Sequence, residues 1–456
     1  MALAPAKWVF IAFAALGCSA VACGSKPFEG NDSGTDAAQI GDAPSFGDTG
    51  DASCGLGCNV VTCDGGGHTT ISGTVYDPGG NNPLYDVLVY IPKFPNDPLP
   101  AIKHGPTCDA CAATISNVIA VTLTDATGKF TLTDVPVGKD IPIVVQVGKW
   151  RRAFVMPSPV VACTDNPFPN PTTPKDRLRL PAKKSEGDMP LIALSTGCDP
   201  MNDLLIKVGI DPTELTPATS TGMVHVYQGK QSDFPLTGST DAYAFWNDAN
   251  AMNKYDILID ACECFPNARG SVAHANLDAF LNAGGRFFGS HYHINWFSGR
   301  LDEGATEPVP ADMYDAANWA SDWGIPGPGP WEIDSTFPKG KAMADWMHVL
   351  YPSDAYGSMP VDSQTSIVED ILSTKPGVSQ QWIVDKTNQI PAYISINTPT
   401  TADADKRCGR AVLADLHVGT PSSSLIEQEA VLEFMFFDLA ACVIDDAKPP
   451  PVPQPN

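Results

Sequence analysis

The stretch at residues 284–293 constrains this chain more than any other, because it combines a helix stop, a buried strand and a polar strand end. Gly284 and Gly285 follow a run with helical spacing, and glycine supplies the left-handed residue on which many helices end. Adjacent apolar residues such as Phe287 and Phe288 are typical of a strand covered on both faces. Ligands of open α/β sheets bind beyond the carboxyl ends of the strands. The polar residues expected at this end are Ser290, His291 and His293.

Strand and helix patterns alternate through the second half of the chain. Strand patterns occupy residues 223–227, 255–261, 284–293, 392–396 and 409–417. Helical patterns occupy residues 241–253, 272–283, 341–350 and 424–443. Strands that alternate with helices predict an α/β doubly wound, flavodoxin-like sheet, which we expect over residues 201–444.

The first half of the chain instead carries short alternating strands separated by Gly and Pro turns. The strand patterns lie at 71–77, 87–92, 120–125, 129–132 and 141–148. This spacing predicts an all-β sandwich, which together with a Pro-rich connecting segment takes up residues 54–200. The chain is therefore predicted to be multidomain.

The run Thr124–Leu132, followed by Val135–Gly138 and preceded by Ser72–Val75, resembles the carboxypeptidase regulatory-like domain over about residues 70–156. That resemblance implies a transthyretin-like sandwich. Such modules serve mostly as spacers, folding partners or binding platforms, so the resemblance predicts a fold and no reaction.

Three later strands, at 255–263, 284–293 and 409–417, resemble the class I glutamine amidotransferase-like fold, and its ThuA-like branch in particular. The resemblance covers about residues 203–443. Amidotransferases place a nucleophilic cysteine after the second of these strands, where this chain has Ser290 and His291. Glutaminase activity is therefore not expected, and Cys262 does not restore that position.

The two-domain arrangement also resembles surface lipoproteins of myxobacteria. The segments that carry this resemblance are Lys149–Arg152, Ser290–His293 and Asp415–Val418. It implies an architecture and no particular chemistry.

The N-terminus is predicted to direct export. Lys7 precedes an apolar run that is too short to span a bilayer, and Ala20–Ala22 followed by Cys23 resembles a bacterial lipoprotein cleavage box. We expect a signal peptide at residues 1–22, a lipid on Cys23 and a disordered tether at 23–53. The alternative is an ordinary secretory signal that leaves Cys23 free. The expected location is the outer membrane, the periplasm or the cell surface, and the Pro-rich tail at 445–456 is predicted to be disordered.

Charge and cysteine content restrict the partners and the compartment. A net charge of -24 argues against nucleic-acid binding, which requires basic patches. In an exported protein, most of the 13 cysteines are expected in disulfides rather than metal sites. Cys18 would leave with the signal peptide and Cys23 would carry the lipid, so an odd number of cysteines remains and at least one thiol is free or paired with another chain. One pairing suggested by position is Cys163 with Cys198.

Three hypotheses compete for the polar strand ends. The first is a site for one divalent transition metal, because His-x-His and Asp-x-His place two ligands on one strand face. Its ligands would be His291, His293, Asp415 and His417. The second is hydrolytic acid–base chemistry with Ser290, His291 and Glu263 as catalytic candidates. The third, which we favour, is a structural or binding role for these groups.

Tryptophans are dense after His291, and exposed tryptophans stack on sugars. The candidate ligand-stacking residues are Trp296, Trp319, Trp323 and Trp331. Their alternative role is to line a loop-rich core. The sequence thus predicts an envelope-anchored lipoprotein with a binding or assembly role toward a glycan or an envelope protein. The alternative function is a metal-assisted hydrolase.

Overall fold

The computed structural model describes residues 54–108, 111, 114–321, 329–360, 370–415 and 425–456. The predicted signal peptide, the lipid-bearing Cys23 and the tether lie outside these residues. The described residues from 54 onward belong to one compact unit. No helix in the described ranges is long and apolar enough to cross a membrane.

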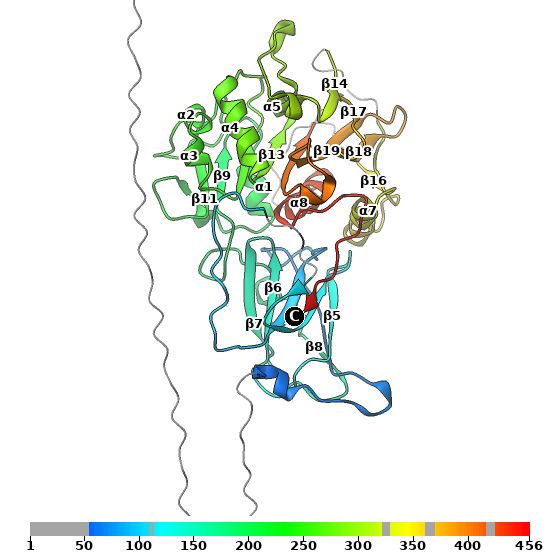
Figure 1. Ribbon diagram of the computed structural model, residues 1–456. Helices are drawn as coiled ribbons and strands as arrows, with labels where there is room; N and C mark the ends of the chain where they lie inside the picture. The colour runs from blue at the N-terminus through cyan, green and yellow to red at the C-terminus, as the bar shows by residue number, and fades with distance from the viewer. Residues whose placement is uncertain (1–53, 109–110, 112–113, 322–328, 361–369, 416–424) are drawn as a thin grey trace, which may run out of the picture. The chain divides into compact units, whose positions relative to one another are not determined.

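The N-terminal β region, residues 70–167, contains two small sheets (Figure 1). One has the order β5-β1-β8 and the other the order β4-β2-β6-β7. The first sheet comprises β1 (Thr70–Thr74), β5 (Lys129–Thr133) and β8 (Asp165–Pro167). The second comprises β2 (Leu88–Pro92), β4 (Val118–Leu123), β6 (Pro142–Val147) and β7 (Trp150–Val155). Ile71 and Phe130 of the first sheet share a hydrophobic core with Val89 and Val145 of the second. The all-β prediction therefore holds, whereas the transthyretin-like assignment stays a prediction.

The α/β region, residues 192–440, is built on a ten-stranded mixed sheet with the order β10-β11-β9-β12-β13-β20-β19-β18-β15-β16. Six strands pair in parallel: β9 (Ile192–Ser195), β10 (Leu215–Pro217), β11 (Val224–Tyr227), β12 (Ile257–Asp260), β13 (Arg286–Ser290) and β20 (Gly409–Ala414). Four follow in antiparallel pairing: β15 (Trp331–Ile333), β16 (Ser358–Met359), β18 (Ser379–Asp385) and β19 (Pro391–Thr398). The doubly wound prediction describes the parallel half only.

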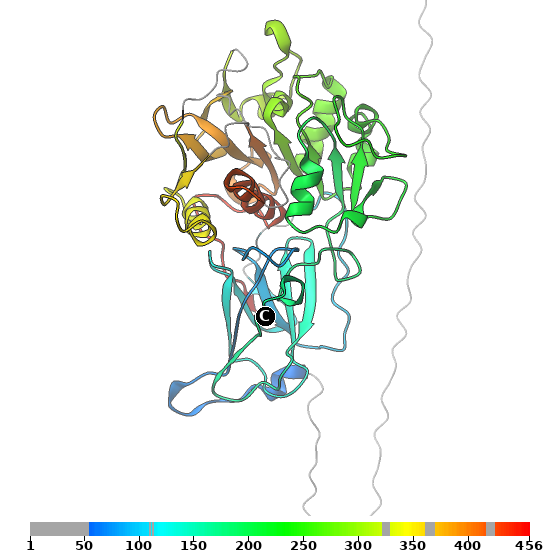
Figure 2. The same ribbon diagram turned by 180° about the vertical axis from the view of Figure 1, so that it is seen from behind.

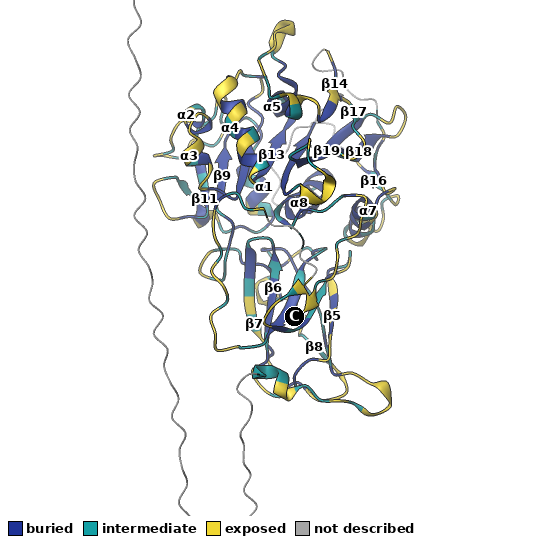
Figure 3. Cartoon of the chain, viewed as in Figure 1, coloured by how far each residue is buried: buried dark blue, intermediate teal, exposed yellow. Residues whose placement is uncertain are grey.

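Helices cover both faces of this sheet (Figures 1 and 2). One face packs against α2 (Ala242–Trp246), α3 (Ala249–Met252), α4 (Ser271–Asn282), α5 (Asn295–Ser298) and α6 (Ala311–Tyr314). The other packs against α1 (Met201–Lys207), α7 (Pro338–Leu350) and α8 (Glu427–Ala440). Phe287 and Phe288 of β13 point to opposite faces, as the adjacent pair predicted, and the central strands are buried (Figure 3). Two short strand pairs complete the described part of the fold: β14 (Ala317–Trp319) with β17 (Ile371–Thr374), and β3 (Thr114–Ile115) with β21 (Gln454–Pro455).

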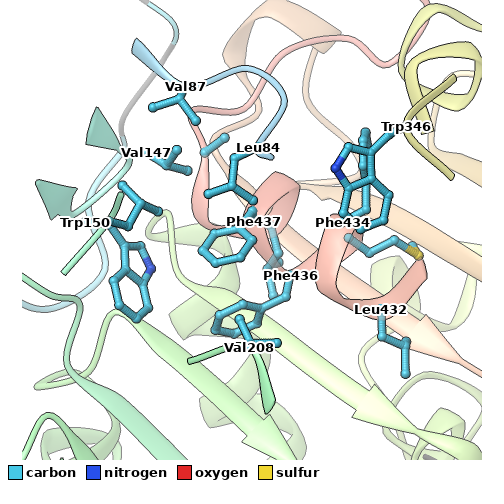
Figure 4. Close-up of a cluster of buried hydrophobic side chains, with 14 of the residues drawn as sticks. Leu84, Val87, Val147, Trp150, Val208, Trp346, Leu432, Phe434, Phe436 and Phe437 are labelled. Atoms are coloured by element: carbon cyan, nitrogen blue, oxygen red, sulfur yellow. The ribbon is translucent and has the colours of Figure 1, made fainter. Parts of the chain in front are cut away.

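Helix α8 joins the two regions. It is buried at nearly every position, and an apolar surface on all sides suits a helix enclosed by the rest of the protein. In Figure 4, Phe434 and Phe437 of α8 lie in one cluster with Leu84, Val147 and Trp150 of the N-terminal β region. The two regions therefore share a continuous hydrophobic core.

Two of the expected domain boundaries are wrong. Strand β9 precedes residue 200, yet it is a central strand of the α/β sheet, between β11 and β12. The tail after residue 444 is ordered: β21 pairs with β3, and the Asp446 carboxylate lies 3.0 Å from the buried Arg410 guanidinium. The buried charge of Arg410 pairs with the tail, and the Pro-rich composition of the tail gives no indication of this ion pair.

The cysteines form five disulfides within the described residues, as expected for an exported chain. The proposed pairing of Cys163 with Cys198 is wrong, because Cys163 bonds to Cys63 and Cys198 bonds to Cys264. The remaining disulfides are Cys54–Cys58, Cys108–Cys408 and Cys111–Cys442. Within this part of the chain the left-over thiol is Cys262, which is buried.

Candidate functional site

Ser290 ends β13 at the carboxyl edge of the parallel strands. Its hydroxyl hydrogen-bonds to an aspartate and a backbone amide rather than to a histidine. Ser290 Oγ donates a hydrogen bond to Asp199 Oδ2 at 2.8 Å and accepts one from the Cys262 backbone N–H at 2.9 Å. The side chain is fully buried. A serine nucleophile needs a base within hydrogen-bond reach, and the observed acceptor is a carboxylate.

His291 follows Ser290 with a left-handed backbone, at a φ of 46°. This residue starts a short 3₁₀ segment, η5 (His291–Ile294), so the strand ends earlier than predicted. The expectation that His291 and His293 share a strand face is therefore wrong. The His291 ring points to the thiol of the neighbouring strand end, with Nδ1 3.4 Å from Cys262 Sγ.

His293 is enclosed in a separate network. Arg269 Nη2 donates to His293 Nδ1 at 3.0 Å, and the other ring nitrogen, Nε2, bonds to the Ala261 carbonyl. Burial and the adjacent Arg269 charge lower the pKa of His293 to about 3, so the ring is neutral at physiological pH. Both ring nitrogens are engaged, which leaves neither for a metal.

Glu263 and Trp296 belong to this same network around Arg269. The Arg269 guanidinium lies 3.1 Å from both Glu263 Oε2 and Asp260 Oδ2. Tyr243 donates to Glu263 Oε2 at 2.7 Å, and the Trp296 indole donates to Asp260 Oδ2 at 2.7 Å. Glu263 is thus an ion-pair partner of Arg269 in this structure, and the network gives it no reacting partner.

Within the described residues, the predicted metal ligands His291, His293 and Asp415 each contact other protein groups. Asp415 is buried and accepts a hydrogen bond from the Asp370 backbone N–H at 2.8 Å, while His417 lies outside the described residues. Among described residues, the atoms with metal-ligand spacing belong to Cys198, Asp199 and Cys262, within 4.8 Å of one another. Cys198 is consumed in a disulfide, so this grouping offers no complete ligand set.

The candidate tryptophans that the structure describes, Trp296, Trp319 and Trp331, do not form an exposed stacking surface. Trp296 is fully buried and Trp331 is 7% exposed. Trp319 is half-buried and donates its indole N–H to the Tyr314 carbonyl at 2.9 Å. Trp323 lies outside the described residues. The prediction that Trp296 and Trp331 stack on a ligand is wrong, because both side chains complete the core.

A cavity of about 450 Å³ lies at the opposite edge of the sheet. Pro190, Ile257 and Arg286, which line it, stand at the amino ends of β9, β12 and β13. The N-terminal β region supplies Asp86, Leu88, Leu123, Gln146 and Val147, and the C-terminal tail supplies Pro450, Pro451 and Pro453. Sequence reasoning missed this site, since distant segments build it and the patterns around Lys149 and Arg286 gave no sign of a cavity.

Most charged groups in the cavity wall are compensated. Lys149 Nζ donates to Asp256 Oδ1 and to the Gly105 carbonyl, both at 2.7 Å. Arg286 donates to the carbonyls of Gly284 and Cys408 at 2.7 and 2.6 Å. The Lys149 charge is therefore neutralised by Asp256, whereas the Arg286 guanidinium keeps its charge and hydrogen-bonds to backbone carbonyls.

Asp86 is the exception. Its backbone N–H bonds to the Thr124 carbonyl, but its carboxylate makes no hydrogen bond within the described residues. Burial raises the pKa of Asp86 to about 7, against the weaker opposing effect of the Lys339 charge. A carboxyl group that lines a cavity without a donor is a ready partner for a ligand.

Comparison with known proteins gives distant similarities. No protein-family model matches the chain, and no curated protein matches it. A ThuA-like protein from Bacteroides uniformis aligns at 10% identity over 54% of this chain and 88% of its own, with a TM-score of 0.28. A ThuA-like protein from Parabacteroides merdae aligns at 13% identity over 57% of this chain and 100% of its own, with a TM-score of 0.31. The function is therefore argued from the site alone.

Proposed function

We propose that this protein is an exported, envelope-anchored binding protein whose ligand occupies the cavity between the N-terminal β region and the α/β region. The cavity is the observation that carries this proposal. Its volume falls within the roughly 300–1,000 Å³ typical of small-molecule sites. Its walls combine apolar side chains with few polar groups, which is the usual composition of such sites.

The wall chemistry favours an elongated apolar ligand with a protonated amine. Leu88, Ile102, Leu123 and Val147 offer apolar surface. Lys149 and Arg286 are occupied by protein acceptors, whereas the carboxylate of Asp86 is not. An ammonium group beside Asp86 would supply the missing donors and charge, and a ligand carboxylate would be repelled there.

Export and anchoring are supported by separate features. Five disulfides within the described residues suit an oxidising compartment outside the cytosol. The proposed signal at residues 1–22 would direct export, and the lipid on Cys23 with the tether at 23–53 would then hold the folded part near a membrane surface. The buried Trp296 and Trp331 remove the main reason to propose a glycan as ligand.

The metal-assisted hydrolase has less support than binding. His293 is committed to Arg269 and Ala261, and Ser290 is committed to Asp199. Elemental analysis of the purified protein beside a His291→Ala/His293→Ala variant tests that alternative. One equivalent of a transition metal that is lost in the variant would restore it.

The binding proposal is tested by calorimetric titration of three ligands that share a chain: decylamine, decanol and decanoate. A Cys23→Ser chain carries no lipid, which avoids detergent. We expect one decylamine per chain with at least tenfold tighter binding than decanoate. Leu88→Trp fills the cavity and should abolish binding, whereas Leu372→Trp, at a half-exposed position, should not. Equal binding by both variants, or no binding of any of the three ligands, would overturn the proposal.

A further inference from the structure

Three cysteine sulfurs meet at the carboxyl ends of β9 and β12. Cys198 and Cys264 form a disulfide, and Cys262 is the free thiol between them in sequence and beside them in space. The sulfurs of Cys198 and Cys262 lie within 4.8 Å of each other. We propose that these residues form a thiol–disulfide exchange centre in which Cys262 attacks the Cys198–Cys264 bond.

His291 is placed to act as the base. Its Nδ1 lies 3.4 Å from Cys262 Sγ, within hydrogen-bond range for sulfur. The backbone N–H of Cys264 donates to the same sulfur at 3.3 Å and would stabilise a thiolate. The left-handed backbone of His291 turns the ring toward the thiol, so a strained backbone conformation accompanies this contact.

The exchange step balances without an oxidant. The Cys262 thiol gives its proton to His291 Nδ1, and the thiolate attacks Cys198 Sγ. A Cys198–Cys262 bond forms as the Cys198–Cys264 bond breaks, and the electron pair leaves on Cys264 Sγ as a thiolate, while the His291 imidazolium releases its proton to solvent. The number of disulfides is unchanged.

The three cysteines of the exchange centre differ in their exposure to solvent. Cys262 is buried and Cys198 half-buried, whereas Cys264 is exposed. The reaction therefore moves a thiol from the interior to the surface. There the Cys264 thiolate can attack a disulfide of an exported protein or a small disulfide, with release of one of its thiols. The substrate class is thus a disulfide, and the product is a mixed disulfide on Cys264.

The resting state keeps this thiol latent. Burial, followed by the negative charge of Asp199, raises the pKa of Cys262 well above its usual value. The free thiol is therefore protonated at neutral pH, and exchange depends on proton transfer to His291. A thiol without such a base, in the same burial, would be inert.

The test is alkylation of the native full chain with iodoacetamide, followed by acid quenching and non-reducing peptide mapping. We expect the label on Cys264 together with a new Cys198–Cys262 disulfide. Label on Cys262 with Cys198–Cys264 retained, or no label over the lifetime of the folded protein, would overturn the proposal.

Two variants separate exchange from unfolding. Cys262→Ser should abolish labelling of Cys264, because no nucleophile remains. His291→Asn keeps a residue type that tolerates the left-handed backbone, so it should slow labelling at least tenfold without changing the melting temperature. The Cys108–Cys408 disulfide serves as an internal control and should stay intact throughout. Labelling of Cys264 that persists at the wild-type rate in either variant would contradict the mechanism.

Discussion

Asp77 of the N-terminal β region and Glu433 of α8 bring two fully buried carboxyl groups together where the two regions meet. Asp77 Oδ1 accepts from the Asn81 backbone N–H at 2.7 Å, and Glu433 Oε2 accepts from Asn82 Nδ2 at 2.6 Å. The other two oxygens, Asp77 Oδ2 and Glu433 Oε1, have no such donor in the described structure. They satisfy each other when one proton lies between them, so the junction of the two regions requires a protonated carboxyl group.

This pair predicts a loss of stability at alkaline pH. Burial raises the pKa of Asp77 to about 7 and that of Glu433 well above its usual value. The folded state then holds protons that the unfolded chain has released, so the pair's contribution falls as pH rises above the unfolded pKa values, through 7 and beyond. The side-chain amide of Glu433→Gln donates a hydrogen bond at every pH. This substitution should therefore reduce the pH-dependent loss of unfolding free energy by roughly 1–3 kcal/mol. Urea unfolding at pH 6 and pH 9 measures this change, and parallel profiles for variant and wild type would contradict it.

Asp86 predicts a pH-dependent preference for amines. Its raised pKa, about 7, means that the carboxyl group is neutral at pH 5.5 and ionised at pH 8. Decylamine stays protonated over this range, so its affinity should rise several-fold from pH 5.5 to pH 8, whereas that of decanol should not. Asp86→Asn should abolish the rise and leave decanol binding intact. A rise that persists in the variant would assign the effect to another group.

Asp86 should also destabilise the empty protein. Because its folded pKa is raised, ionisation costs stability as pH rises from about 4 through 7. Asp86→Asn is therefore expected to stabilise the ligand-free protein by roughly 1–2 kcal/mol at pH 8, with little effect at pH 4. Thermal or urea unfolding at the two pH values checks the sign. Destabilisation at pH 8 would mean that the carboxylate has a favourable partner in the folded state.

The tail is predicted to stabilise the fold through Asp446. Arg410 is fully buried and contacts Asp438 at 2.6 Å and Asp446 at 3.0 Å. Asp446→Asn leaves the buried guanidinium with one carboxylate fewer, and we expect a loss of about 3 kcal/mol in urea unfolding. The matched control is Asp445→Asn, whose pair with the exposed Lys448 should contribute less than about 0.5 kcal/mol. Equal effects of the two substitutions would exclude a structural role for the tail.

Gly148 marks a close approach between the two regions. Its φ is +51°, and a Cβ there would collide with the Ala440 carbonyl at the end of α8. Gly148→Ala should therefore destabilise by about 1–3 kcal/mol more than Gly377→Ala, which has a similar φ of +73° but no neighbouring atom within 4 Å. The difference in destabilisation between the two variants measures the effect of the collision separately from that of backbone strain. Similar losses in both variants would show that the interface can shift to admit a methyl group.

Local patterns in the sequence were sufficient for the elements themselves. The glycine pair and the adjacent phenylalanines predict β13, and the apolar run after residue 409 predicts β20. These predictions succeed because strand and helix periodicity depends on neighbours within a few residues. Strand β9 was missed because three apolar residues and a serine beside a Pro-rich stretch have no local pattern, and only pairing with β11 and β12 defines them.

The candidate site was likewise predictable from the sequence only in part. The sequence determined that Ser290, His291 and Cys262 stand at strand ends, since each follows a buried strand. Only the tertiary structure decided their partners: a left-handed backbone at His291 separates its ring from that of His293 and brings it to Cys262. The cavity at Asp86 depends on packing among the N-terminal β region, α8 and the tail. Periodicity is a local property of the chain, whereas a cavity and a thiol–disulfide cluster are made by segments that meet only when the core closes.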